Sequence, residues 1–194
     1  MPFARFVTEF GNIAVLTPLC IAIAVWIALD VSHRAAVLWL CCVGAVTLST
    51  ALAKLWFAGC HYDWSHIQSL SGHTSFSVIA YGGAAVVLTA GAPCPKRWTI
   101  GLLCVVWVIG IGITRVALGA HTPQEVVSGW LIGGIGIAVF ASYYRASQRP
   151  SLYAIAATAA LLVLIALMPQ AHLSLENFLR WLGQWVVERV PICL

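Results

Sequence analysis

Two polar stretches carry the residues of this sequence whose types and spacing are best suited to chemistry. The first, SLSGHTSFS, occupies residues 69–77, and the second, TRVALGAHTPQEV, occupies residues 114–126. Both lie between strongly apolar segments, where ionisable residues are costly and commonly mark function. Together with the residues just before the first stretch, they supply Lys54, His61, His66, Ser71, Gly72, His73, Arg115, His121 and Glu125.

These residue types point to an oxyanion site. Each stretch opens an apolar helical segment, and exposed amides at a helix N-terminus attract anions. Arg115 adds a forked cation and Lys54 a compact one, both suited to phosphate. A histidine paired with a carboxylate can act as a nucleophile, and a second histidine can protonate a leaving group.

Several of these residues also have a purely structural explanation. Thr122 to Glu125 match a capping box with proline at the first helical position, so Glu125 could serve only as a helix cap. Ser71 could be an N-cap, and Lys54 could extend its amine to the membrane surface. Arg115 is harder to explain this way, because it lies inside the apolar end of its segment without a neighbouring acidic residue.

The composition indicates which elements must position these residues. Of 194 residues, 61% are hydrophobic and 8% are charged, which excludes an ordinary soluble domain. A helix needs about 20 apolar residues to cross the hydrocarbon core, and lipid requires backbone groups to bond internally. The sequence therefore predicts an all-α integral membrane protein, a six-transmembrane-helix bundle forming one domain over residues 1–194. The expected spans are about 12–29, 35–58, 74–92, 99–118, 126–144 and 152–168.

With six spans, both polar stretches emerge on one face, where they can meet. The links on the other face carry Arg34, Lys96, Arg97, Arg145 and Arg149. By the positive-inside rule those links are cytoplasmic, which places the polar stretches on the outer face of what we expect to be a bacterial inner membrane. Residues 173–191 alternate apolar and charged positions in a way that favours an amphipathic C-terminal helix in the membrane interface, or else a helix that binds a partner.

The motifs resemble those of the type-2 phosphatidic acid phosphatase superfamily, which includes lipid phosphatases and vanadium haloperoxidases. Its pattern is Lys-x6-Arg-Pro, Pro-Ser-Gly-His and Ser-Arg-x5-His-x3-Asp. This chain reads KLWFAGCHY from Lys54, LSGH from Leu70 and TRVALGAHTPQE from Thr114. The order and spacing of the motifs agree, although the motifs themselves cover a small part of the chain.

Five positions depart from that pattern. Leu70 replaces proline and Thr114 replaces serine, and neither change removes a charge. Glu125 replaces aspartate, which keeps the carboxylate but lengthens its reach. His61 replaces arginine, beside Tyr62 in place of proline, and a histidine is charged only at lower pH.

The resemblance implies a role for each matching residue. His121 would attack phosphorus and form a phosphohistidine, Glu125 would orient it, and His73 would protonate the departing oxygen and then activate water. The phosphoryl oxygens would be held by Lys54, Ser71, Gly72 and Arg115, with His61 in the place of the arginine. No metal or other cofactor is implied.

The expected substrate is a lipid phosphate or diphosphate: phosphatidic acid, phosphatidylglycerol phosphate, an isoprenyl diphosphate or a lipid A phosphate. The expected surroundings are the bilayer; no nucleic acid is expected, and the sequence names no protein partner. Two other classes remain open. The histidines could bind a metal or haem, although Lys54 and Arg115 argue against a cation site. The same scaffold could also bind phospholipid without catalysis.

Overall fold

The structure is a computed structural model that describes residues 2–59 and 69–144, together with the single positions 158 and 185. Every regular element within this part is a helix. The sixth expected span, the amphipathic tail, His61 and His66 lie outside the described residues. An all-helical membrane protein is therefore what the described part shows, whereas the count of six spans and the tail helix stay predictions.

The described helices, in chain order, are α1 (Pro2–Glu9), α2 (Ile13–Asp30), α3 (His33–Gly59), α4 (Gly72–Leu88), α5 (Cys94–Ala117) and α6 (Pro123–Tyr143). Four helical stretches are long and apolar enough to cross a membrane: Pro2–Asp30, His33–Phe57, Cys94–Ala117 and Pro123–Tyr143. The first of these stretches comprises both α1 and α2. α4 is apolar too, but shorter.

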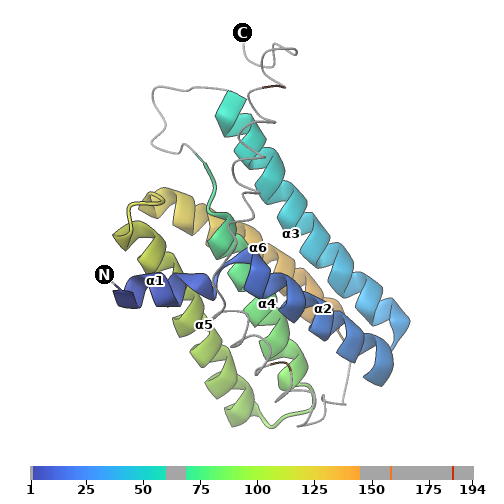
Figure 1. Cartoon of the computed structure of the whole chain (residues 1–194). Helices are drawn as coiled ribbons and strands as arrows, with labels where there is room; N and C mark the ends of the chain where they lie inside the picture. Colours follow the sequence, from blue (N-terminus) through green and yellow to red (C-terminus); the bar gives the residue numbers. More distant parts are fainter. Residues whose placement is uncertain (1, 60–68, 145–157, 159–184, 186–194) are drawn as a thin grey trace.

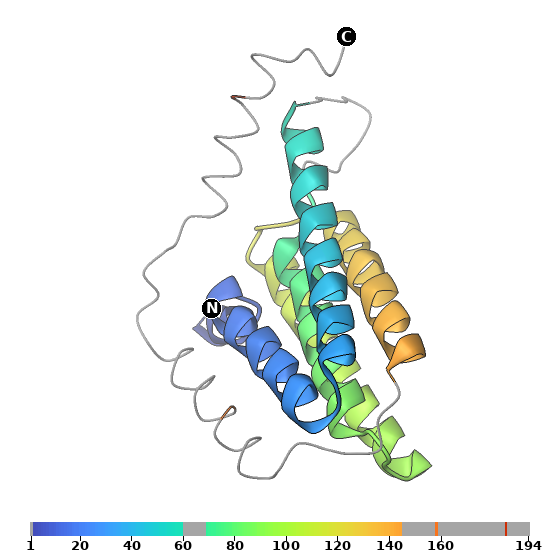
Figure 2. The ribbon, with the colours of Figure 1, turned by 90° about the vertical axis from the view of Figure 1, so that its right-hand side faces the viewer.

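α4 is the central helix of the bundle. It packs against α2, α3, α5 and α6, as the two perpendicular views show (Figures 1 and 2). Its closest partner is α6, because that helix presents glycines to it. A Cβ on Gly129 would stand 2.5 Å from the Thr74 hydroxyl, and one on Gly133 would stand 2.5 Å from the Ser75 carbonyl. Glycine at these two positions therefore lets the two helices come into close contact.

The apolar core lies between α2, α3, α4 and α6. The Trp39 indole donates a hydrogen bond of 2.9 Å to the Cys20 carbonyl, and its ring lies 4.9 Å from that of Phe140. Gly83 makes room for the indole, since a Cβ there would be only 2.2 Å from the ring. Cys20 is thus a buried free thiol that packs as a small apolar residue, as expected from its apolar surroundings.

The helices differ from the predicted segments at several ends; α5, for example, begins at Cys94, five residues before the predicted start at residue 99. α4 stops at Leu88, four residues before the predicted end, because the chain turns through Gly91 with a φ of 60°. The apolar residues after Leu88 conceal this turn from a hydropathy pattern. α1 has no counterpart among the predicted segments, because this eight-residue helix precedes the first predicted span at 12–29.

Candidate active site

The structure brings the two polar stretches together at one end of the bundle. The end of α3, the start of α4 and the turn from α5 to α6 all lie toward the upper end in Figure 1. The contact is direct: the Ser69 backbone N–H donates to Glu125 Oε1 at 2.8 Å, across 56 residues of sequence. The Ser71 N–H also approaches the Glu125 carbonyl, at 3.4 Å.

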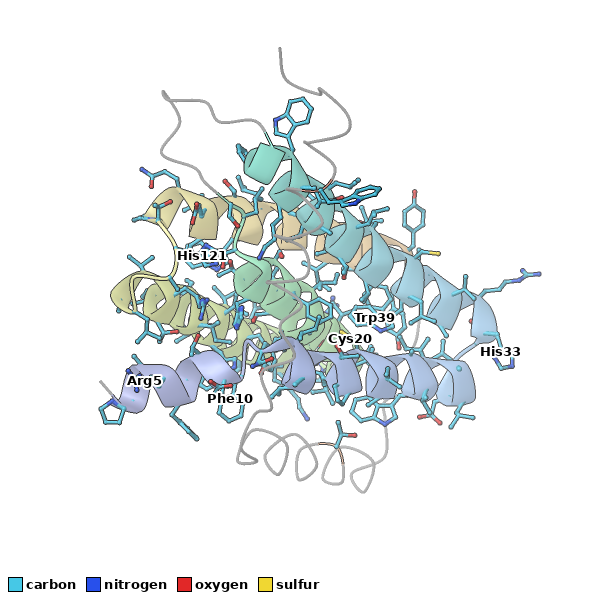
Figure 3. The ribbon with its side chains drawn as sticks, turned by 45° about the horizontal axis from the view of Figure 1, so that its top comes forward. Arg5, Phe10, Cys20, His33, Trp39 and His121 are labelled. Atoms are coloured by element: carbon cyan, nitrogen blue, oxygen red, sulfur yellow. The ribbon has the colours of Figure 1, made fainter. Side chains whose placement is uncertain are left out.

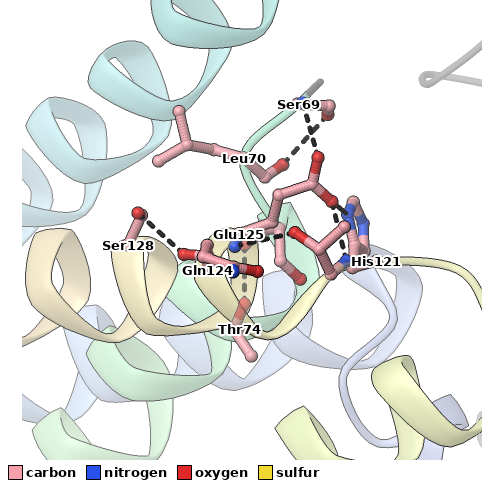
Figure 4. A network of polar contacts seen from close by, with 9 residues as sticks. Ser69, Leu70, Thr74, His121, Gln124, Glu125 and Ser128 are labelled. Atoms are coloured by element: carbon pink, nitrogen blue, oxygen red, sulfur yellow. Dashed lines mark hydrogen bonds and ion pairs between the residues drawn. The ribbon is translucent and has the colours of Figure 1, made fainter. Parts of the chain in front are cut away.

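Glu125 links the parts of this site. Its Oε2 accepts hydrogen bonds from His121 Nδ1 at 2.8 Å and from the Thr122 N–H at 3.1 Å (Figure 4). The Thr122 hydroxyl accepts from the Glu125 N–H in return, which completes the capping box expected from the sequence. The cap and the histidine contact therefore coexist in one carboxylate. A carboxylate only accepts, so the His121 Nδ1 carries the proton and Nε2 keeps its lone pair.

The turn before α6 sets the place of His121. α5 ends at Ala117, and Gly119 adopts a φ of +67°, which lets the chain reverse. The N–H groups of Ala120 and His121 both donate to the Arg115 carbonyl, at 3.0 and 3.3 Å. Backbone bonds thus fix His121 close to the residue that carries the forked cation.

The electrostatics of the site favour a neutral His121. Burial lowers the pKa of His121 below its usual value of 6.5; Glu125 opposes this, and the charges of Arg115 and Lys54 lower the pKa further. The His121 and Glu125 side chains are only 4% and 5% exposed. At neutral pH the imidazole accordingly keeps the uncharged form that a nucleophile needs.

The start of α4 supplies the second half of the site. The Ser75 backbone N–H makes the first hydrogen bond of the helix, to the Ser71 carbonyl at 3.1 Å. The backbone N–H groups of residues 72–74 therefore take no part in the intrahelical hydrogen bonds. The Lys54 amine reaches this end, lying 3.8 Å from where a Cβ on Gly72 would stand. His73 has Arg115, His121 and Lys54 as its charged or chargeable neighbours.

Ser71 occupies the N-cap position of α4, but its hydroxyl does not cap the helix. The side chain is fully buried, and its oxygen has no hydrogen-bond partner among the residues that the structure describes. A buried hydroxyl without a partner is unfavourable unless a ligand satisfies it. The Ser71 hydroxyl is therefore not the helix cap that the sequence allows.

The site contains polar groups that sequence reasoning missed. Ser69 is one, because its role depends on its backbone N–H and not on its side-chain type. Thr8 is another: its hydroxyl lies 3.3 Å from Arg115 Nη1. No signal in the sequence joins residues 107 positions apart. Within the described part, no three histidine, cysteine or acidic residues come together as metal ligands would.

The candidate site thus consists of a histidine held by a carboxylate, a second histidine at a helix N-terminus, and two cations near both. The family model of the PAP2 superfamily matches residues 47–149, more than half of the chain and all of these groups. The chain belongs to the PAP2 superfamily. PAP2 membership indicates a phosphatase acting on lipid-like phosphates, and the apolar helices indicate a membrane protein. No curated protein and no solved structure matches the chain.

The longer carboxylate of this PAP2 protein gives a test of the hydrogen-bond network. Glu125→Gln should lower kcat/KM by about 10²- to 10⁴-fold, because an amide cannot accept from all three donors and no longer holds His121 in one tautomer. The Glu125 carboxylate raises the pKa of His121. Loss of the carboxylate should therefore also move the acid limb of the kcat/KM profile against pH to lower pH. Rate measurements across pH check both effects.

Gln124→Ala is the matched control for this PAP2 variant, because Gln124 is exposed on the same helical turn. Its rate and pH profile should equal those of the wild type. An acid limb that stays in place or moves to higher pH in the Glu125→Gln enzyme would contradict the assigned interaction.

Proposed function

We propose that this protein is an integral membrane lipid phosphatase that hydrolyses a lipid phosphate monoester or diphosphate through a phosphohistidine on His121. The observation that carries the proposal is the Glu125 contact to His121 Nδ1, which leaves Nε2 as the nucleophilic atom beside two cations. Family membership supports phosphate as the group transferred.

The first half of the reaction is displacement at phosphorus. The Nε2 lone pair of His121 forms the bond to phosphorus while the bond to the lipid oxygen breaks. The departing oxygen takes a proton from His73, and a bound phosphate dianion favours the protonated form of that histidine. Arg115, Lys54 and the amides of Gly72 and His73 stabilise the charge on the equatorial oxygens.

The second half returns the enzyme to its starting state. Neutral His73 takes a proton from water as the water oxygen forms a bond to phosphorus. The bond between phosphorus and Nε2 breaks, and its electron pair returns to His121. Inorganic phosphate leaves, and Glu125 holds the imidazole in the same tautomer throughout. The chain supplies every proton transfer in this scheme.

The proposed location of the site is the outer face of a bacterial inner membrane. The starts of α3 and α5 lie at the end of the bundle opposite to the site (Figure 1). They carry the exposed residues Arg34, Lys96 and Arg97, which supports a cytoplasmic placement of that end. An outward site at the bilayer edge suits a lipid headgroup. A reporter fused after Lys96 should then read cytoplasmic, and an external reading there would reverse the orientation.

A phosphate-release screen tests the proposed function. Purified protein in mixed micelles should release phosphate from at least one of phosphatidic acid, phosphatidylglycerol phosphate, an isoprenyl diphosphate and a lipid A phosphate. The activity should survive EDTA and be blocked by vanadate, which imitates the trigonal bipyramidal transition state. Loss of activity in EDTA, with recovery when a divalent ion is added, would favour a metal site. No phosphate release from any of these lipids would favour a protein that binds phospholipid without catalysis.

A further inference from the structure

The N-terminal helix α1 is packed against the end of the bundle that holds the candidate site. It crosses α5 (Figure 1), and its residues Val7 and Thr8 are buried. Phe3 and Phe6 of the same helix are 77% and 49% exposed, as expected for a helix that is partly in contact with lipid. We call the side of α1 that carries Val7 and Thr8 its inner face.

The turn after α1 is fixed by several contacts. The Tyr81 hydroxyl of α4 donates to the Phe10 carbonyl at 2.9 Å, and the Phe10 ring lies edge-on to Trp107 of α5 at 5.4 Å. Gly11 allows the turn to approach α5, since a Cβ there would be 2.8 Å from Ile111 Cγ2. The place of α1 is therefore determined by α4 and α5, the two helices that supply His73 and Arg115.

The inner face of α1 touches the candidate site through Thr8. Arg115 Nη1 donates a hydrogen bond to the buried Thr8 Oγ1 at 3.3 Å. The neighbouring carboxylate, Glu9, is occupied elsewhere, since its Oε2 accepts from the Asn12 side chain at 3.2 Å. Arg115 is thus contacted from α1 by a neutral oxygen, although an acidic residue is next in sequence.

We propose that Thr8 is a positioning residue for Arg115, and that α1 through Thr8 forms part of the phosphate site. The role rests on the proposed function. A hydroxyl accepts one of the five guanidinium donors and adds no negative charge of its own, so it directs the guanidinium without competing with a phosphate for it. A carboxylate in the same place would compete with the substrate.

The experiment compares Thr8→Val with Thr8→Ser. Valine keeps the size and branching of threonine but removes the acceptor, whereas serine keeps the acceptor. Thr8→Val should raise KM for the lipid phosphate by about 3- to 10-fold, with a smaller change in kcat, because the lost hydrogen bond orients a group that holds phosphate in both ground and transition states. Thr8→Ser should stay near the wild-type KM. An unchanged KM in Thr8→Val overturns the role.

A double-mutant cycle separates positioning from stability. Arg115→Lys keeps a charge but lacks the planar fork, so adding Thr8→Val to it should raise KM no further. The same rise in both backgrounds would mean that Thr8 acts through helix packing, and would overturn the proposal. A wild-type protein that releases no phosphate overturns the proposed function and this role together; an active wild type with an unaffected Thr8→Val overturns the role alone.

Discussion

His121→Ala should abolish phosphate release, by at least about 10⁴-fold in kcat/KM, because the imidazole is the group that forms the covalent intermediate in the proposed reaction. The protein should still insert and fold. His121 lies in a turn between α5 and α6, outside the apolar core, and the backbone bonds of that turn do not need its side chain. The measurement is phosphate release from the best lipid substrate, with thermal unfolding in the same detergent.

His33→Ala is the matched control for this variant. His33 is an exposed histidine at the start of α3, at the far end of the bundle from His121 (Figure 3). Its loss should leave the rate unchanged. Turnover within tenfold of the wild type in the His121 variant would remove that residue as the nucleophile.

His73→Ala should have the second largest effect, a loss of about 10²- to 10⁴-fold on lipid phosphates, because an alkoxide leaves poorly without a proton. An aryl phosphate with an acidic phenol needs no such proton. With that substrate, the His73 variant should release about one phenol per enzyme quickly and then stall, since His73 also activates the water of the second step.

Rapid-mixing measurement of phenol release checks this pattern. An equal loss in the first turnover on the aryl and the lipid substrate would contradict a proton-donating role, and would leave His73 as a residue that only binds phosphate.

The helices of this protein could be predicted from sequence because lipid imposes a simple requirement on length and composition. The segments expected at 35–58 and 126–144 correspond to α3 and α6 within a few residues at each end. The N-terminal helix was missed because eight residues make too short a pattern. Its docking depends on Phe10 and Gly11 meeting α4 and α5, which is a tertiary property.

The candidate site was predicted in its residue types more fully than in its geometry. His121 and Glu125 are four residues apart, but His121 precedes the N-cap Thr122 of α6, so the turn before the helix, not a helical turn, brings the imidazole to the carboxylate. The sequence could not show that the same carboxylate also binds the Ser69 N–H, since that contact depends on how α6 packs on α4. The same packing explains how a glutamate in place of the family's aspartate is accommodated. Its oxygens lie between two segments and contact both.

The most direct test of the account is to trap the covalent intermediate. Wild-type protein mixed with a lipid phosphate carrying a radioactive phosphoryl group should be quenched in alkali within the first turnover, because a phosphohistidine survives alkali and is lost in acid. The account predicts an acid-labile label on the peptide that contains His121, absent from the His121→Ala protein. A label on another residue, or none in an enzyme that turns over in the same sample, would contradict it.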